Sequence, residues 1–490
     1  MKIHLKVFNL IFIILLVLLI GCTNRNISNN KIKEKSNITD FSKTEDAINI
    51  IKEIINPSVG LTGKFALFLN DNLLGLFDFN KNILFKIPTN IDMYPNKDLN
   101  DLFSEKNIFI FSGKLNNQYD IFSLNIDNNE IQNLSNDMDC DDLNPLLSKN
   151  GEFVIFEKIK DKSKIFLLLN LNNKTIKPIY SSSDKNKNFK TFFCLDNKKI
   201  LFFSGEEEGI AFIINIVDNT IESIINNEEK VLEIKLSPNG EKIAITSENK
   251  SRKEKNISIY NIKEKSLLRT SKIETYFNTA GLVWSYDSTK ISWEALNNNS
   301  LTDIFIYDLV SNKTINITNT KQYKELGIKW SNKQDYVAWT RYEGDSWQDR
   351  VVCSYNLNTN HLFQFYFPDL EDPILNSSNH LWSPDGKNIL FSYYKEGNGS
   401  YNISYCNKDG SNLKQLTNLY SSDARYFLWS FDGKWIAYFE VLRINAIDIA
   451  ASPENEDNRV KLKIIDSINS KIIYEYSLYN YIDFKSLWIK

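Results

Sequence analysis

The feature that most constrains this 490-residue chain is a short turn sequence that recurs at nearly even intervals. Residues 381–391 read Leu-Trp-Ser-Pro-Asp-Gly-Lys-Asn-Ile-Leu-Phe, and residues 428–438 read Leu-Trp-Ser-Phe-Asp-Gly-Lys-Trp-Ile-Ala-Tyr. Fuller and weaker copies place the serine-equivalent position at 148, 194, 237, 285, 331, 383 and 430, separated by 43–52 residues. Two fainter copies precede them, near Ser104 and Gly63. A period of this length indicates a repeat architecture.

Each repeat has the same internal order. A strand leads into a turn in which Pro presets φ and Gly accepts a positive φ. A hydrophobic strand follows, such as residues 243–245, and then a third strand, such as residues 303–308, and a short fourth one, such as residues 315–318. Four antiparallel strands per repeat are typical of a propeller blade. We therefore predict an all-β fold, with a single β-propeller of eight to nine four-stranded blades over residues 59–490.

The two ends of this region complement one another. Residues 483–490 resemble the strand that precedes each Trp-Ser pair, whereas residues 63–68 read as a second strand that lacks its first. Open edge strands invite aggregation, and a closed ring removes them. We predict that the C-terminal strand completes the first blade and closes the ring.

The turn motif resembles the TolB-like (WD40-like) propeller repeats, which also occur in the propellers of dipeptidyl and prolyl peptidases. The resemblance spans roughly residues 60–490 and is clearest in residues 237–437. The peptidases carry a separate hydrolase domain with a G-x-S-x-G nucleophile elbow, and that motif does not occur in this sequence. His361 and His380 are the only histidines beyond residue 21 and do not form a sequence cluster. We expect no enzyme activity, no cofactor and no metal site.

The first 21 residues have the pattern of a signal peptide. Lys2 and Lys6 precede a run from residue 7 to 20 with one polar side chain, which is shorter than the ~20 residues of a membrane span. The run ends at a Gly-Cys pair that resembles a bacterial lipobox, so we predict cleavage after residue 21 and lipidation of Cys22.

Residues 22–58 are predicted to form a lipidated flexible tether that contains a short helix. Residues 23–40 are rich in Asn, Lys and Ser and cannot bury a core. Ile48, Ile51 and Ile55 then fall at helical spacing, and Pro57 ends the pattern.

Charge and composition narrow the class of partner. The formal net charge is −3 with no basic patch, so nucleic acid is not expected as a partner. Besides Cys22 the chain holds Cys140, Cys194, Cys353 and Cys406, which could pair in three ways. The strand-like runs around Cys194, Cys353 and Cys406 favour unpaired buried thiols over disulfides. The recurrent tryptophans are expected in the cores between blades, and the repeated Asp of the turns is expected to serve turn chemistry.

Irregular connections are the predicted functional surface, because loops on a rigid scaffold commonly carry function. Three such stretches mix aromatic, Arg and acidic residues: 342–350, 393–401 and 442–459. The candidate interaction residues are Tyr342, Trp347, Arg350, Tyr393, Tyr394 and Arg443.

These patterns predict a lipoprotein of the bacterial cell envelope, anchored to the outer membrane through the lipid on Cys22 and facing the periplasm or the cell surface. We expect a non-catalytic scaffold whose propeller loops bind an envelope protein of unknown identity. The alternative is small-ligand or glycan binding, or a cryptic hydrolase or lyase activity, at the central channel of the propeller.

Overall fold

The computed structural model describes most of the chain beyond residue 50. The described ranges are 51–55, 61–69, 72–86, 91–94, 103–115, 118–128, 130–136, 140–160, 163–194, 196–205, 209–273, 281–296, 301–343, 350–365, 380–395, 399–442, 460–478 and 484–489. All named elements in these ranges are β-strands, and the described residues include no helix long and apolar enough to cross a membrane.

The strands form nine antiparallel sheets, so the propeller has nine blades and the higher of the two predicted numbers is confirmed. Blade 1 contains β37 (Phe484–Ile489), β2 (Lys64–Leu69), β3 (Asn72–Asp78), β4 (Ile83–Lys86) and β1 (Ile51–Ile54). Blade 2 contains β5 (Asp92–Met93), β6 (Ile108–Leu115), β7 (Gln118–Asn125) and β8 (Glu130–Asn133). Blade 3 contains β9 (Asp141–Leu147), β10 (Phe153–Lys160), β11 (Ser163–Asn170) and β12 (Thr175–Ser182). Blade 4 contains β13 (Lys190–Phe193), β14 (Lys199–Ser204), β15 (Ile210–Asn215) and β16 (Ile221–Ser223).

The remaining five blades follow the same order. Blade 5 contains β17 (Glu229–Leu236), β18 (Lys242–Asn249), β19 (Lys255–Asn261) and β20 (Ser266–Ile273), and blade 6 contains β21 (Val283–Trp284), β22 (Lys290–Leu296), β23 (Thr302–Asp308) and β24 (Lys313–Asn316). Blade 7 contains β25 (Tyr323–Trp330), β26 (Tyr336–Glu343), β27 (Arg350–Asn356) and β28 (His361–Gln364), and blade 8 contains β29 (His380–Trp382), β30 (Asn388–Lys395), β31 (Ser400–Asn407) and β32 (Lys414–Gln415). Blade 9 contains β33 (Ser422–Trp429), β34 (Trp435–Leu442), β35 (Val460–Asp466) and β36 (Ile472–Leu478).

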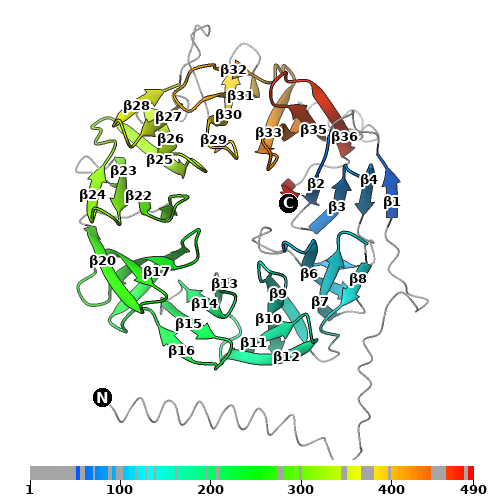
Figure 1. Ribbon diagram of the computed structural model, residues 1–490, viewed down its shortest axis with the longest axis vertical. Coiled ribbons are helices and arrows are strands. Elements are labelled where there is room, and N and C mark those ends of the chain that lie inside the picture. Colours follow the sequence, from blue (N-terminus) through cyan, green and yellow to red (C-terminus); the bar gives the residue numbers. More distant parts are fainter. Residues whose placement is uncertain are drawn as a thin grey trace, which may run out of the picture. The chain divides into compact units, whose positions relative to one another are not determined.

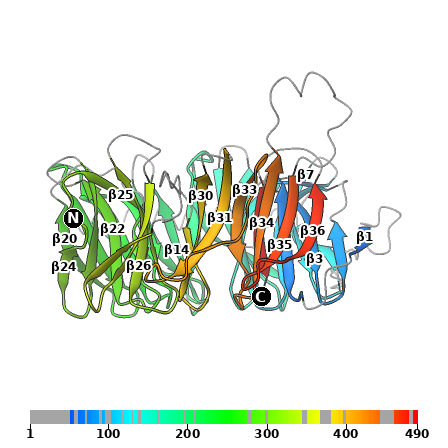
Figure 2. The same ribbon diagram turned by 90° about the horizontal axis from the view of Figure 1, so that it is seen from above.

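The blades are arranged around one axis, with the first strand of each blade near the centre and the fourth at the rim (Figure 1). Because neighbouring strands are antiparallel, the connections between strands alternate between two faces of the ring, which Figure 2 shows from the side. We call the face with the first-to-second and third-to-fourth connections the turn face. The opposite face, with the second-to-third connections and those between blades, is the loop face.

Nine apolar clusters hold the ring together, one at each junction between adjacent blades. At the junction of blades 6 and 7, for example, Ile304 and Ile306 pack with Trp330 and Trp339. Burial of apolar surface contributes about 25 cal/mol per Å². The apolar burial that stabilises each blade therefore comes mainly from its contacts with the two neighbouring blades.

The recurrent turns confirm the turn chemistry expected from the sequence. In blade 8, Ser383 Oγ donates to Asp385 Oδ1 over 2.6 Å and accepts from Asn388 N over 3.0 Å. Gly386 follows with φ 71°, a conformation that glycine adopts without strain. The same Ser–Asp bond of 2.6 Å recurs between Ser285 and Asp287 and between Ser430 and Asp432.

Ring closure by the C-terminal strand is also confirmed. β37 pairs with β2 in antiparallel register from Lys64 opposite Ile489 to Leu69 opposite Phe484. The first blade therefore combines strands from both ends of the propeller.

The helix predicted around Ile51 and Ile55 is wrong for the part that the structure describes. Ile51–Ile54 forms strand β1, which pairs with β4 at the rim of blade 1. The free edge of β4 offers backbone partners to this segment, and tertiary pairing overrides the helical spacing of its isoleucines. The propeller sheet therefore begins before residue 59. The signal peptide, Cys22 and the rest of the predicted tether lie outside the described residues.

The cysteines agree with the prediction of buried thiols. Cys194, Cys353 and Cys406 are buried and form no disulfide, and Cys140 is buried as well. Burial raises the pKa of the Cys194 and Cys353 thiols to about 12 in each case. Thiols in such surroundings are unreactive.

Candidate functional site

In three consecutive blades, the described ends of the second and third strands meet on the loop face: β26 with β27, β30 with β31, and β34 with β35. These strand ends form the candidate site, which we call the loop face of blades 7–9. The described ends of the three predicted interaction stretches thus lie on one side of the ring, although they are far apart in sequence.

Tyr342 and Arg350 form the first element of this surface. They lie at the facing ends of β26 and β27 and are opposite one another in the strand register. The guanidinium carbon of Arg350 lies 4.9 Å from the centre of the Tyr342 ring. Both residues are half-buried, and a cation–π contact contributes about 0.5–1 kcal/mol when exposed and about 2 kcal/mol when desolvated. Trp347, predicted to act beside them, lies outside the described residues.

A buried ion pair between β25 and β26 lies next to this strand end. Arg341 Nε donates to Glu325 Oε1 over 2.8 Å, and the indole Nε1 of Trp339 donates to the same carboxylate. The Arg341 guanidinium carbon also lies 4.7 Å from the centre of the Tyr323 ring. Sequence reasoning missed Tyr323 and Arg341, because only the pairing of β25 with β26 brings them together.

Blade 8 contributes a tyrosine pair, but with one correction. Tyr394 and Tyr401 are opposite one another in β30 and β31, with ring centres 5.2 Å apart. Tyr393, by contrast, is only 1% exposed and packs in the core between blades 7 and 8, so it is not a surface contact. Burial raises its pKa to about 12. Successive strand residues point to opposite faces, which places Tyr393 inward when Tyr394 points outward.

The connection in blade 8 is also shorter than predicted. β30 extends to Lys395 and β31 begins at Ser400, so residues 393, 394 and 401 are strand residues rather than loop residues. Arg443, the candidate residue of blade 9, lies outside the described residues.

A second group of buried polar side chains surrounds the bulge in β25. Gly327 has φ 75° at this bulge, and its N–H donates to Glu294 Oε1 of blade 6 over 2.6 Å. The Ile328 N–H donates to the same oxygen over 3.1 Å. Glu294 Oε2 is buried with no hydrogen-bond partner among the described residues. Burial raises the pKa of Glu294, although the two N–H bonds oppose this change.

His380 and Lys329 lie on the other side of this bulge. His380 is 1% exposed in β29, its Nε2 lies 3.2 Å from Ala338 O, and Nδ1 has no partner among the described residues. Burial, reinforced by nearby Lys329, lowers the pKa of His380 to about 3, so the ring is neutral at physiological pH. Lys329 Nζ donates to His380 O over 2.7 Å.

Both histidines of the described ranges lie in strands. His361 begins β28 of blade 7, and its ring centre lies 4.5 Å from that of Phe363, whereas His380 lies in β29 of blade 8. The polar contact of His380 is with a backbone carbonyl, whereas a general base in a serine mechanism is oriented by a carboxylate. No group of three His, Cys, Asp or Glu side chains suited to a metal occurs within the described ranges.

The fold defines the protein as a nine-bladed β-propeller. Aromatic and cationic side chains, the pairs Tyr342–Arg350 and Tyr394–Tyr401, lie on one side of its loop face. No family model matches the sequence, and no curated protein matches it. A eukaryotic initiation factor structure is similar with a TM-score of 0.56 and 12% identity, over 87% of this chain and 98% of that one. At this level of identity the similarity shows the fold.

Two further similar structures are a dipeptidyl peptidase and a TolB protein, whose families contain the propeller repeats that the turn motif resembles. Dipeptidyl peptidase 4 of Porphyromonas gingivalis is 11% identical with a TM-score of 0.49, over 68% of this chain and 54% of that one. This chain therefore spans about half of that peptidase. A protein described as TolB from Agrobacterium tumefaciens is 14% identical with a TM-score of 0.27, over 65% of this chain and 91% of that one.

Proposed function

We propose that this protein is a bacterial cell-envelope lipoprotein, anchored through Cys22, whose propeller binds a protein partner through the loop face of blades 7–9 without catalysing a reaction. The observation that carries the docking part is the alignment of Tyr342 with Arg350 and of Tyr394 with Tyr401 at neighbouring strand ends. Tyr and Arg are enriched at interface hot spots, and rigid strand ends reduce the entropy lost on binding.

The anchoring part rests on the sequence of residues 1–22. Replacement of Cys22 by Ser removes the thiol that would carry the lipid. We expect the variant to move from the membrane fraction to the soluble fraction and to lose incorporation of labelled palmitate. Retention of the Cys22→Ser variant in membranes, with label still incorporated, would refute the anchor.

The docking part is tested by cross-linking in intact envelopes followed by mass spectrometry. Wild-type protein is compared with an Arg350→Ala and Trp347→Ala double variant and with Lys387→Ala, a control on the turn face whose side chain is 70% exposed. We expect one protein adduct to be lost in the double variant and kept in the control. An adduct that is insensitive to the double variant argues against this surface.

A second candidate function is small-ligand binding near the ring axis. It is favoured by the buried polar atoms without partners on Glu294 and His380, which flank the first strand of blade 7. A bound small molecule or ion in purified protein, lost in Glu294→Gln, would favour this alternative over a docking surface.

A further inference from the structure

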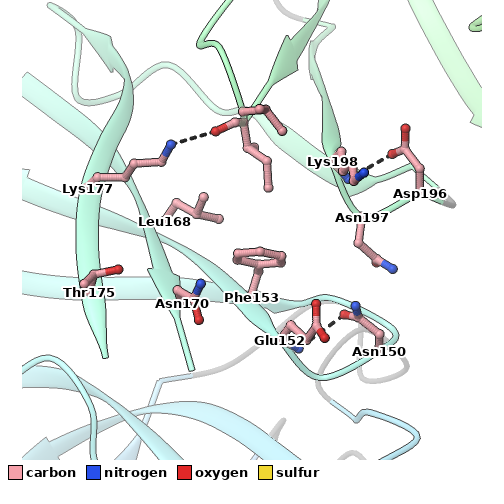
Figure 3. A pocket seen from close by; sticks show the side chains of 12 residues that line it. Asn150, Glu152, Phe153, Leu168, Asn170, Thr175, Lys177, Asp196, Asn197 and Lys198 are labelled. Carbon is pink, nitrogen blue, oxygen red and sulfur yellow. Dashed lines mark hydrogen bonds between the residues drawn. The ribbon is translucent and has the colours of Figure 1, made fainter. Parts of the chain in front are cut away.

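A groove lined by both polar and apolar side chains opens on the turn face between blades 3 and 4 (Figure 3). Its volume is about 410 Å³, which lies within the range of about 300–1,000 Å³ typical of small-molecule sites. One wall is formed by β10, β11 and β12, and the other by the turns of blade 4 at residues 196–198 and 216–217. It lies on the face opposite the loop face of blades 7–9.

At the junction of blades 6 and 7, charged side chains span the equivalent position. Lys290 and Asp308 are opposite one another there at the start of the second strand and the end of the third. Lys290 Nζ lies 3.8 Å from Asp308 and 3.9 Å from Asp335 of the next blade, so charged side chains bridge the two blades.

At the junction of blades 3 and 4, the corresponding register pair is Phe153 with Asn170. Neither side chain can form the ion pairs made by Lys290. A hydrogen bond of 2.6 Å from Lys177 Nζ to Ile216 O spans the groove on one side, and the ring of Phe153 lies among Asn170, Asn197 and Glu152 (Figure 3). At this register position, blade 3 thus has an aromatic ring and an amide where blade 6 has an ion pair.

Several polar groups of the groove retain unused hydrogen-bonding capacity. The carboxylate of Glu152 makes no hydrogen bond or ion pair with the described residues, and neither does the ammonium of Lys198. Asn170 Oδ1 accepts from Asn172 N over 2.9 Å, and Asn150 Oδ1 accepts from Ser148 Oγ over 2.8 Å. The side-chain amide nitrogens of Asn150 and Asn170 thus remain available as donors.

This combination matches the chemistry of a neutral sugar. Each sugar hydroxyl both donates and accepts, so it pairs with carboxylates and amides, while the C–H face of the ring packs on an aromatic side chain. The acidic and basic side chains of the lining, Glu152 and Asp196 against Lys177 and Lys198, balance in charge. That balance disfavours a strongly charged ligand.

We infer that this groove binds one or two residues of a neutral saccharide. The sugar ring packs on Phe153, and its hydroxyls pair with the Glu152 carboxylate and with the amides of Asn150 and Asn170. The proposal does not depend on the docking function of the loop face.

The test uses the full chain and a panel of neutral di- and trisaccharides of glucose, galactose, mannose and N-acetylglucosamine. Binding is detected by saturation-transfer NMR and quantified by calorimetry. We expect at least one saccharide to bind, and Glu152→Gln and Phe153→Leu each to weaken it about tenfold, the loss expected for one hydrogen bond to a charged group or one packed ring.

The matched control is Glu130→Gln in the equivalent groove between blades 2 and 3, which holds only about 140 Å³. We expect this control to leave affinity unchanged, and all variants to keep the thermal midpoint of the wild-type protein. Failure of every saccharide to bind overturns the proposal. So does binding that is insensitive to Glu152→Gln and Phe153→Leu, which places the sugar elsewhere, or equally sensitive to Glu130→Gln.

Discussion

The indole Nε1 of Trp284 donates a hydrogen bond of 2.9 Å to the carbonyl oxygen of Lys235, in the first strand of the preceding blade. Trp330 makes the corresponding bond to Val283 O over 3.1 Å, and Trp382 to Lys329 O over 3.1 Å. The tryptophan of the repeat therefore fastens each of these blades to the one before it, in agreement with its predicted place between blades. Trp429 differs, because its Nε1 is buried with no partner among the described residues.

This difference yields a matched pair of variants. Trp382→Phe removes the indole donor to the Lys329 carbonyl, which we expect to lower the free energy of unfolding by about 1 kcal/mol. Trp429→Phe removes an unsatisfied N–H and is expected to change stability much less. Urea unfolding followed by intrinsic fluorescence compares the two midpoints. Equal losses of stability in the two variants would show that packing of the indole, rather than its hydrogen bond, stabilises the contact between blades.

Two turn glycines with the same backbone conformation should respond differently to alanine. Gly386 and Gly433 have φ 71° and 72°, so each alanine variant carries a backbone cost of about 1 kcal/mol. A Cβ on Gly433 would meet Pro384 Cδ at 3.7 Å, an ordinary contact, whereas on Gly386 it would lie 2.4 Å from Ser331 Oγ. We expect Gly386→Ala to lower the thermal midpoint clearly more than Gly433→Ala. The reverse order would contradict the close approach of blades 7 and 8 at this turn.

The turn aspartates predict a dependence of stability on pH. Burial tends to raise the pKa of Asp385 and of Asp432, but hydrogen bonds from the turn serine and from a backbone N–H outweigh burial and lower both pKa values. Asp287 behaves in the same way. The folded pKa of each aspartate is below the unfolded value of about 3.9. The ionised carboxylates therefore stabilise the folded protein above about pH 3.9, and this stabilisation is lost as the pH falls toward the folded pKa.

The variant that isolates this effect replaces all three aspartates by Asn. Asn already stands at this position in blades 3 and 5, where Asn150 and Asn239 accept from their turn serines over 2.8 Å. We expect the thermal midpoint of the triple variant to fall less than that of the wild-type protein between about pH 5 and pH 3. Parallel curves for the two proteins would remove these carboxylates from the explanation.

The sequence predicted the parts of the fold that local chemistry determines. Turn residues such as Ser383 and Asp385 act within a few residues of one another, so their spacing identifies the blades. Strand β1 could not be predicted, because its pairing with β4 joins segments that are not adjacent in sequence. The decayed turn near Ser104 explains why the sequence predicts eight to nine blades rather than a single number.

The candidate site was predicted less completely than the fold. Tyr342, Arg350 and Tyr394 were identified from loop composition, and the register places them at facing strand ends. Tyr393 was misassigned because strand alternation turns it into the core. Glu294 and Gly327 lie in different blades, and the hydrogen bond between them is visible only in the folded ring.

Closure of the ring predicts a strong effect of a short truncation. Deletion of residues 484–490 removes β37 and exposes the backbone edge of β2. We expect the truncated protein to unfold at lower urea concentration and to aggregate, because an unpaired hydrophobic edge recruits other strands. Deletion of Lys490 alone is the control. A stable monomer after the longer truncation, measured by size-exclusion chromatography with light scattering, would contradict this closure.

The most direct test of the proposed docking surface is site-specific photo-cross-linking in living cells. A photoreactive amino acid is placed at position 350 or 394 on the loop face of blades 7–9, or at position 387 on the turn face as a control. We predict that positions 350 and 394 capture the same protein and that position 387 does not. Capture of that protein from position 387 alone, or of no protein from either loop-face position, would contradict the assignment.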